Sequence, residues 1–231
     1  MLLLKYIDWP ALQNTSVFMG VLRSNSSWIS YMKITSITPQ QKTEGRYSVY
    51  VDGEFALGLG EDDLVRLGLY TGQELTGNQL ERTRAEAEFS KAYQRVVNYI
   101  SIRPRSEWEI TDYMRRKSYS VETARAVLDK VKRLQLVDDQ AFARSWVEWR
   151  QSTTPRSRYQ LQQELARKGV DEETIEEALS GIDEDEQVRT ARALIDKKGH
   201  RYSSRGKLMS YLSRQGFTYD TIQKALGEET E

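Results

Sequence analysis

Residues 157–169 read SRYQLQQELARKG, and residues 106–118, which lie 51 positions earlier, read SEWEITDYMRRKS. The same shift aligns residues on both sides of these segments, among them Ala92 with Ala143, Val96 with Val147, Arg105 with Arg156, Thr123 with Thr174 and Leu128 with Leu179. A further shift of 47 positions aligns Arg158 with Arg205, Leu161 with Leu208, Leu165 with Leu212, Gly169 with Gly216 and Leu179 with Leu226. The chain therefore contains three copies of one structural unit.

Each copy has the periodicity of amphipathic α-helices. In the first copy, Phe89, Tyr93, Val96, Val97 and Ile100 share one helical face. The pattern predicts nine helices between Asn78 and Leu226, in repeats at about 79–134, 138–180 and 184–227 within a domain of residues 78–227. Every repeat consists of a longer helix, a basic connection and two short helices around a tight turn.

One such unit cannot bury its apolar face alone, so stacked copies should form an elongated, curved solenoid. This body would offer a long surface and no obvious deep pocket. The expected fold is thus mainly α, with three tandem three-helix repeats preceded by a small β-hairpin/α module at residues 32–77.

Capping signals mark the ends of the predicted helices. Ser106 and Glu109 have the spacing of a capping box, and further N-caps are expected at Ser120, Asp138, Asp171 and Thr218. Gly169, Gly199 and Gly216 stand where helices commonly end. The apolar positions predicted to point inward include Val131, Leu134, Phe142, Trp146 and Trp149.

The preceding module is predicted from a turn signal. Asp52-Gly53 separates two alternating runs, Arg46–Val51 and Glu54–Leu59, which predicts a hairpin whose two turn residues have positive φ. Lys33–Thr38 predicts another strand, and Glu61–Leu69 a short helix with acids in its first turn.

The chain before this module lacks comparable patterning. Met1–Tyr31 has no caps and no sustained period, and Asp8 and Pro10 interrupt the apolar run that a signal peptide needs. We expect residues 1–31 to be a disordered extension or to precede the true start at Met32, with an ordered N-terminal arm as the alternative. Residues 228–231 are expected to form a short tail.

Composition excludes several classes of protein. The 231 residues include no Cys and one His, which excludes disulfides, a cysteine nucleophile and His-rich metal sites. No apolar run approaches the roughly 20 residues of a membrane span. Nucleotide-binding glycine motifs and zinc-protease motifs are absent, and each carboxylate cluster opens a predicted helix, where acids match the helix dipole. The sequence therefore predicts a cytoplasmic, non-enzymatic protein without cofactor or metal.

The net charge of zero conceals a segregated distribution. Asp171–Glu186 contains nine acids and no Lys or Arg, whereas Asp196–Phe217 contains six basic residues and one acid. Basic side chains recur in and near the connections of the repeats, where they would suit a phosphate backbone or an acidic groove. Solvated charge that balances the acidic stretch is the alternative interpretation. The candidate partner-binding residues are Arg103, Arg105, Arg115, Arg116, Lys117, Arg156, Arg158, Lys197, Lys198, Arg201, Arg205 and Lys207.

Each repeat ends in a helix, a turn and a helix, which is the order of a helix-turn-helix motif. In that motif the second helix enters the major groove. In the middle repeat this helix is Asp171–Ser180, with five acids and no basic residue, so base readout is electrostatically excluded there. Trp146 and Trp149 could stack on single-stranded bases, although repeat core and its rim are the more common role of such residues.

The order of these motifs resembles the RecX family, bacterial regulators of the RecA recombinase. The resemblance covers about Phe89–Leu226, and it rests on the opening at Arg105–Ile110, the LVDDQAFA segment at 136–143, Glu164-Leu165 with Lys168-Gly169, and the closing run at 207–217. The module before the repeats is similar to the N-terminal part of longer members.

The resemblance implies a non-enzymatic role. It implies binding to the RecA nucleoprotein filament on single-stranded DNA and inhibition of recombinase and ATPase activity. The acidic helix Asp171–Ser180 predicts at most weak, non-specific affinity for nucleic acid, and we expect a monomer. Members of the family are often basic, whereas this chain is neutral. The alternatives are a general nucleic-acid-binding helical repeat protein and a peptide-binding repeat scaffold.

Overall fold

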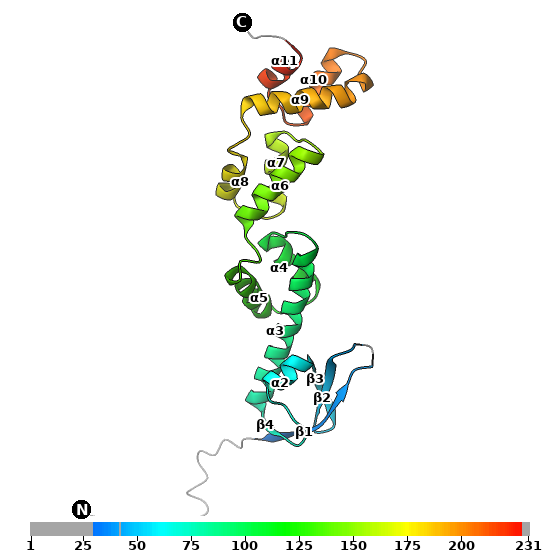
Figure 1. The fold of residues 1–231 in the computed structure, drawn as a ribbon, viewed down its shortest axis with the longest axis vertical. Coiled ribbons are helices and arrows are strands. Elements are labelled where there is room, and N and C mark those ends of the chain that lie inside the picture. The colour runs from blue at the N-terminus through cyan, green and yellow to red at the C-terminus, as the bar shows by residue number, and fades with distance from the viewer. Residues whose placement is uncertain (1–29, 42, 228–231) are drawn as a thin grey trace, which may run out of the picture. The chain divides into compact units, whose positions relative to one another are not determined.

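The computed structural model describes residues 30–41 and 43–227 (Figure 1). The described chain divides into two compact units, with the boundary between Arg84 and Ala85. The predicted extension at Met1–Tyr31 lies outside the described residues except for Ser30 and Tyr31, and the predicted tail at 228–231 lies outside them as well. Tyr31 is the first residue of strand β1, so this strand begins one position before Met32.

The first unit contains a four-stranded antiparallel sheet. Its strands are β1 (Tyr31–Pro39), β2 (Arg46–Val51), β3 (Glu54–Gly60) and β4 (Glu74–Thr76), in the spatial order β3-β2-β1-β4. The predicted hairpin is confirmed, since Asp52 and Gly53 have φ of 50° and 88° between β2 and β3. Helix α2 (Glu61–Arg66) follows β3 and is shorter than the sequence pattern indicated.

Strand β4 was not predicted. It has only three residues, and it pairs with the start of β1, where Tyr31 lies opposite Thr76. So short a segment carries too little alternation to be recognised from its sequence, and its extended conformation depends on the neighbouring strand.

Nine α-helices follow in the described part of the chain. The first repeat contains α3 (Gly77–Ile102), α4 (Glu107–Arg116) and α5 (Val121–Arg133). The second repeat contains α6 (Asp139–Thr153), α7 (Arg158–Arg167) and α8 (Glu172–Leu179). The third contains α9 (Glu184–Lys198), α10 (Arg205–Arg214) and α11 (Tyr219–Ala225), with the 3₁₀ turn η2 (Gly199–Arg201) between its first two helices. Helix α3 crosses the boundary between the two units.

Each repeat has its own buried cluster, which confirms the predicted class of three three-helix repeats after a small β-module. Val96, Ile110 and Val131 are completely buried in the first cluster, and Leu161, Leu165 and Leu179 in the second. In the third cluster Leu212 is completely buried and Ile222 nearly so. The elongated, curved shape remains a prediction.

The predicted caps are present. Ser106 forms the complete capping box with Glu109, and the side chains of Ser120, Asp138, Asp171 and Thr218 each accept a hydrogen bond from a main-chain N–H of their helix. Gly169 and Gly216 have φ of 74° and 86°, a region that favours glycine. Gly199 ends α9 differently, with a right-handed conformation that continues into η2.

Two residues predicted to point inward are exposed. Leu134 is 52% exposed because it is the C-cap of α5, where the chain turns away from the buried face of the helix. Trp149 is 49% exposed, although it lies two turns after the buried Phe142 on the same helix.

Candidate functional site

Most of the predicted basic residues contact other parts of the same chain. Carboxylates pair with Arg103, Arg115, Arg116, Arg156 and Arg158, whereas tyrosine rings lie beneath the charged groups of Arg105, Lys117 and Lys198. The amide of Gln223 accepts from Arg205, and the hydroxyl of Ser203 accepts from Lys207. The sequence pattern therefore located several structural cations among its candidate binding residues.

Five of the predicted basic residues, three of them already named, lie close together along the chain. Lys197 and Lys198 end α9, Arg201 lies in η2, and Arg205 and Lys207 begin α10. Lys197, Arg201 and Lys207 are exposed, and Asp196 is the only carboxylate between residues 196 and 217. We call residues 197–207 the basic segment; it holds five of the predicted binding residues within eleven positions.

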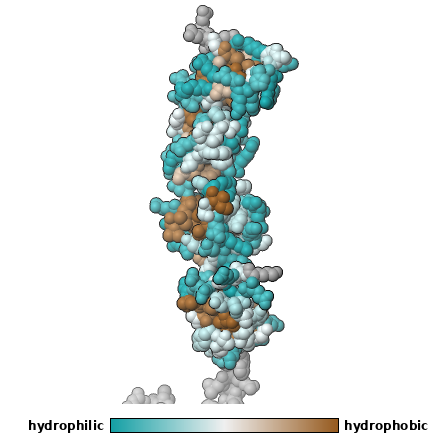
Figure 2. All heavy atoms as spheres, turned by 45° about the vertical axis from the view of Figure 1, so that its right-hand side comes forward, coloured by the Kyte–Doolittle hydropathy of each residue, from teal (hydrophilic) through white to brown (hydrophobic). Residues whose placement is uncertain are grey.

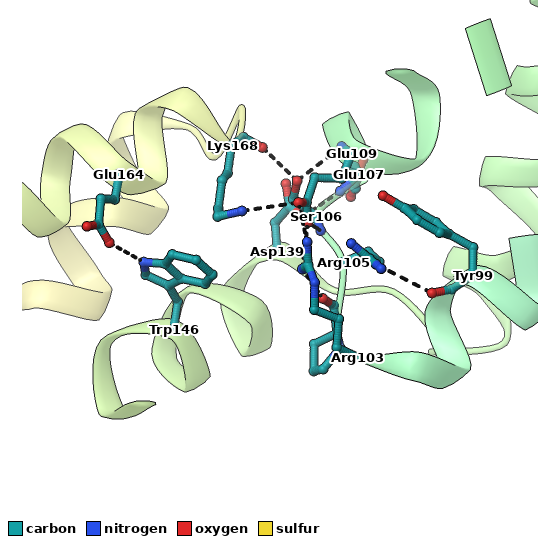
Figure 3. A network of polar contacts seen from close by, with 11 residues as sticks. Tyr99, Arg103, Arg105, Ser106, Glu107, Glu109, Asp139, Trp146, Glu164 and Lys168 are labelled. Atoms are coloured by element: carbon teal, nitrogen blue, oxygen red, sulfur yellow. Dashed lines mark hydrogen bonds and ion pairs between the residues drawn. The ribbon is translucent and has the colours of Figure 1, made fainter. Parts of the chain in front are cut away.

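The contact between the first and second repeats is centred on Ser106 (Figure 3). Its buried hydroxyl accepts a hydrogen bond from the main-chain N–H of Glu109 and donates one of 2.6 Å to the main-chain carbonyl of Lys168. Trp108 lies so close to Gly169 that a Cβ atom on this glycine would be 2.3 Å from the Trp108 Cβ. We call this contact the first joint; it comprises Arg103, Ser106, Trp108, Glu109, Lys168 and Gly169.

Charges reinforce the first joint. One carboxylate oxygen of Glu109 lies 2.8 Å from the Arg103 guanidinium and 3.1 Å from the Lys168 ammonium. Burial by itself would raise the pKa of Glu109, but hydrogen bonds and attraction from Arg103 and Lys168 outweigh it and hold this pKa at about 2. Glu109 is therefore ionised at any physiological pH and links the two repeats through Lys168.

The pKa of a second carboxylate in this region, that of Asp139, is shifted in the opposite direction. Asp139 accepts a 2.8 Å hydrogen bond from the main-chain N–H of Glu107, the first residue of α4. Burial raises the pKa of Asp139 despite this hydrogen bond and the nearby Lys132, which itself pairs with Glu107 at 2.6 Å.

The contact between the second and third repeats has the same geometry without the charges. Ser157 donates to the main-chain carbonyl of Gln215, as Ser106 does to that of Lys168. The side chains of Gln160 and Gln215 are joined by a hydrogen bond of 2.9 Å, and a Cβ on Gly216 would be 2.6 Å from the ring of Tyr159. This second joint, which comprises Ser157, Tyr159, Gln160, Gln215 and Gly216, uses neutral amides where the first joint uses Glu109 and Lys168.

An apolar hollow of about 550 Å³ borders the first joint. We call it the tryptophan hollow; its lining residues are Arg103, Pro104, Phe142, Ser145, Trp146 and Trp149. Trp146 donates from its indole nitrogen to Glu164 at 2.9 Å, and Arg150 lies about equally close to the rings of Trp146 and Trp149. Sequence analysis predicted no obvious deep pocket, and it interpreted both tryptophans as repeat core and rim.

The surface of the molecule carries hydrophobic patches among hydrophilic residues (Figure 2). Large exposed apolar side chains of the second unit include Ile102, Trp108, Leu136, Trp149 and Tyr159. Within residues 30–41 and 43–227, no group of three or more His, Asp or Glu could hold a metal ion, and no helix has the length and apolar character to cross a membrane.

Family models match the chain in four consecutive parts. The RecX N-terminal domain matches residues 32–76, and the first, second and third three-helix domains of RecX match residues 92–130, 138–179 and 184–226.

Relatives of known name cover most of the chain. Regulatory protein RecX of Halalkalibacterium halodurans is 31% identical over 84% of this chain and 77% of its own length. Regulatory protein RecX of Bacillus velezensis is 32% identical over 86% of this chain and 77% of its own length.

Solved structures share the fold. A crystal structure of regulatory protein RecX is 28% identical, with a TM-score of 0.66 over 85% of this chain and 100% of that one. The crystal structure of RecX from Lactobacillus salivarius is also 28% identical, with a TM-score of 0.55 over 60% of this chain and 94% of that one. The chain belongs to the RecX family of regulatory proteins.

Proposed function

We propose that this protein binds the RecA nucleoprotein filament on single-stranded DNA and inhibits its recombinase and ATPase activity. Membership of a family of regulatory proteins is the observation that carries the proposal. In this proposal the protein acts as a cytoplasmic monomer without a catalytic step or a cofactor of its own, and any ATP and DNA are held by the filament.

The basic segment is the part of the chain best suited to meet the filament. Lys197, Arg201 and Lys207 are exposed, whereas Arg103 and Arg158 hold carboxylates of their own chain. A cation that is already paired with a neighbouring carboxylate offers less attraction to an incoming phosphate. We therefore assign the contact with DNA phosphates or with acidic protein surface chiefly to residues 197–207, and only secondarily to the basic connections of the first two repeats.

The ATPase activity of preformed RecA filaments tests the function. Equimolar or lower amounts of this protein should reduce DNA-dependent ATP hydrolysis, and RecA-coated single-stranded DNA should retain the protein in a pull-down. If the protein binds the filament but the ATPase rate is unchanged, the proposed inhibition is wrong. If the protein does not bind the filament, RecA is not its partner.

Charge reversal tests the assignment of residues. The variant with K197E, R201E and K207E should bind filaments at least tenfold more weakly, because three attractive contacts become repulsive. A matched control reverses three exposed cations elsewhere, Lys91, Arg125 and Arg133, and should retain most of the binding. Equal losses in both variants would mean that net charge alone determines the affinity.

A general nucleic-acid-binding protein is the second candidate function. Its distinguishing result would be equal affinity for bare single-stranded DNA and for RecA-coated DNA at the same salt concentration. The proposed function requires preference for the coated DNA.

A further inference from the structure

The tryptophan hollow is not a necessary result of the repeat architecture. The shift of 51 positions that aligns Ala92 with Ala143 places Lys91, Gln94, Arg95 and Asn98 of α3 at the positions of Phe142, Ser145, Trp146 and Trp149 of α6. None of these four residues of α3 is apolar. The aromatic lining thus has no counterpart in the first repeat.

Both tryptophans keep part of their surface in contact with solvent. Trp149 is 49% exposed and Trp146 is only partly buried. Aromatic side chains that line an open apolar recess lose little further entropy on binding, and tryptophan and arginine are the residues that dominate the energy of protein interfaces. A volume of about 550 Å³ lies within the roughly 300–1,000 Å³ of ligand sites.

Positive charge exceeds negative charge around this hollow. The ion pairs that border it contain the four cations Arg103, Arg150, Arg156 and Lys168, but only the two carboxylates Glu109 and Glu164, so each carboxylate is shared by two cations and these pairs keep a net positive charge. Lys168 and Arg150 also lie over the Trp146 ring, at 4.3 and 4.9 Å from its centre (Figure 3 shows Trp146 and Lys168). An occupant that carries negative charge beside an apolar group would therefore be favoured over a neutral or basic one.

Hydrogen-bonding capacity distinguishes a side chain from a nucleic-acid base. The indole N–H of Trp146 is already donated to Glu164, so Ser145, Arg103 and the indole N–H of Trp149 are the remaining polar groups of the lining. A buried base would leave part of its ring nitrogens and exocyclic groups without partners, which is costly, whereas a phenyl or aliphatic side chain has none to satisfy.

We propose that the tryptophan hollow is a docking site for a short acidic peptide segment of a partner protein, which inserts a bulky apolar side chain between Trp146, Trp149 and Pro104 and places its carboxylates near Arg103 and Arg150. The proposal is independent of the identity of the partner and of the RecA filament. It assigns a role to the exposed Trp149, which neither the packing of the repeat nor the basic segment explains.

Fluorescence anisotropy with a labelled peptide tests this site directly. The probe is a short peptide of aspartate and glutamate with one central phenylalanine, measured at low salt against the full chain. Three competitors accompany it: the same peptide with alanine for phenylalanine, the same peptide with lysine for the acids, and an oligothymidylate. The acidic phenylalanine peptide should bind at least tenfold more tightly than the alanine and lysine peptides.

Two variants and one control locate the binding. W149A removes an exposed wall of the hollow, and S145Y fills the hollow from an exposed position. Because both positions are exposed, both variants should fold. Both should lower the affinity for the peptide at least tenfold. S152Y adds the same side chain on the same helix at an exposed residue that does not line the hollow, and it should leave the affinity unchanged. Circular dichroism confirms the fold of each variant.

Defined results would overturn the proposal. Equal binding of the phenylalanine and alanine peptides would show that charge alone attracts them, and unchanged affinity in S145Y would place the peptide elsewhere. The hollow would be identified as a base-stacking site if the peptide does not bind, oligothymidylate binds, and W149A and S145Y both weaken the binding of oligothymidylate. RecA is absent from every measurement, so failure here leaves the function proposed above unaffected.

Discussion

The hydroxyl of Ser106 donates a hydrogen bond of 2.6 Å to the main-chain carbonyl of Lys168, 62 residues further along the chain. The same hydroxyl caps α4, so one buried atom both begins a helix and attaches it to the next repeat. Ser157 repeats both roles, as the N-cap of α7 and as the donor to Gln215. The cap of the middle helix is thus the point at which consecutive repeats are joined.

Replacement of Ser106 should lower the free energy of unfolding by more than the loss of an ordinary helix cap does. S106A removes the cap and leaves the buried carbonyl of Lys168 without its donor, which together should lower the free energy of unfolding by about 2–4 kcal/mol. The matched control is S120A, which removes the cap of α5 from an exposed position and should cost about 1 kcal/mol. Urea unfolding followed by circular dichroism measures both, and equal losses would show that the bond to Lys168 contributes nothing.

Gly169 should not tolerate a side chain. Alanine at this position would have a φ of +74° and a Cβ atom 2.3 Å from Trp108, so G169A should destabilise the protein by about 2–4 kcal/mol. The control G227A has a similar φ of +85° in open space and should cost only about 1 kcal/mol.

A double variant separates the clash from the backbone strain. W108G removes the clashing side chain together with its Cβ, so the cost of G169A in the W108G background should fall toward that of G227A. Additive effects of the two substitutions would mean that Trp108 moves aside without cost.

Stability at low pH should depend on Glu109. Its pKa in the folded protein is about 2, below its ordinary value of 4.5, so its contribution is complete above about pH 5 and is lost as the pH falls from 4.5 toward 2. We expect about 1–2 kcal/mol, less than the whole shift implies, because water screens the partly exposed Arg103. E109Q should flatten this part of the curve of unfolding free energy against pH.

The contribution of Asp139 to stability should have the opposite pH dependence from that of Glu109, so the two must be measured separately. The pKa of Asp139 is raised in the folded protein, so this residue contributes stability at low pH that is lost as the pH rises through its titration range. D139N should therefore make the acid loss of stability steeper, whereas E109Q should make it shallower. A parallel change in both variants would contradict the assignment of either pKa.

Binding to bare duplex DNA should be weak and independent of sequence. Helix α8 occupies the position of a recognition helix, and Glu172, Glu173, Glu176 and Glu177 on it are exposed, so it would meet phosphates with repulsion. The expected Kd is roughly 10⁻⁴–10⁻⁶ M at physiological salt, rising steeply with salt concentration. Titration of labelled duplexes of unrelated sequence measures it, and tight binding to one sequence would restore the helix-turn-helix interpretation.

The sequence by itself determined the elements and their repetition. Helical periodicity, the caps at Ser106 and Asp138, and the glycines at 169 and 216 act within a few residues of the chain, so they are visible without a structure. The Asp52-Gly53 turn is equally local, because its positive φ values depend on the two residues themselves.

Only the tertiary structure decided what the charged and aromatic residues do. The sequence pattern predicted Arg103 to be a binding residue, but in the structure it pairs with Glu109. Helical periodicity predicted that Trp149 points into the core, but in the structure it lines a hollow. The Arg103–Glu109 pair spans six positions, but Lys168 of the next repeat shares its carboxylate, and the hollow beside Trp149 is lined by Arg103 and Pro104 of the first repeat. No local preference specifies which residues of another repeat lie opposite. The periodicity of a helix tells which residues share a face, whereas the packing of the neighbouring repeat determines whether that face is covered.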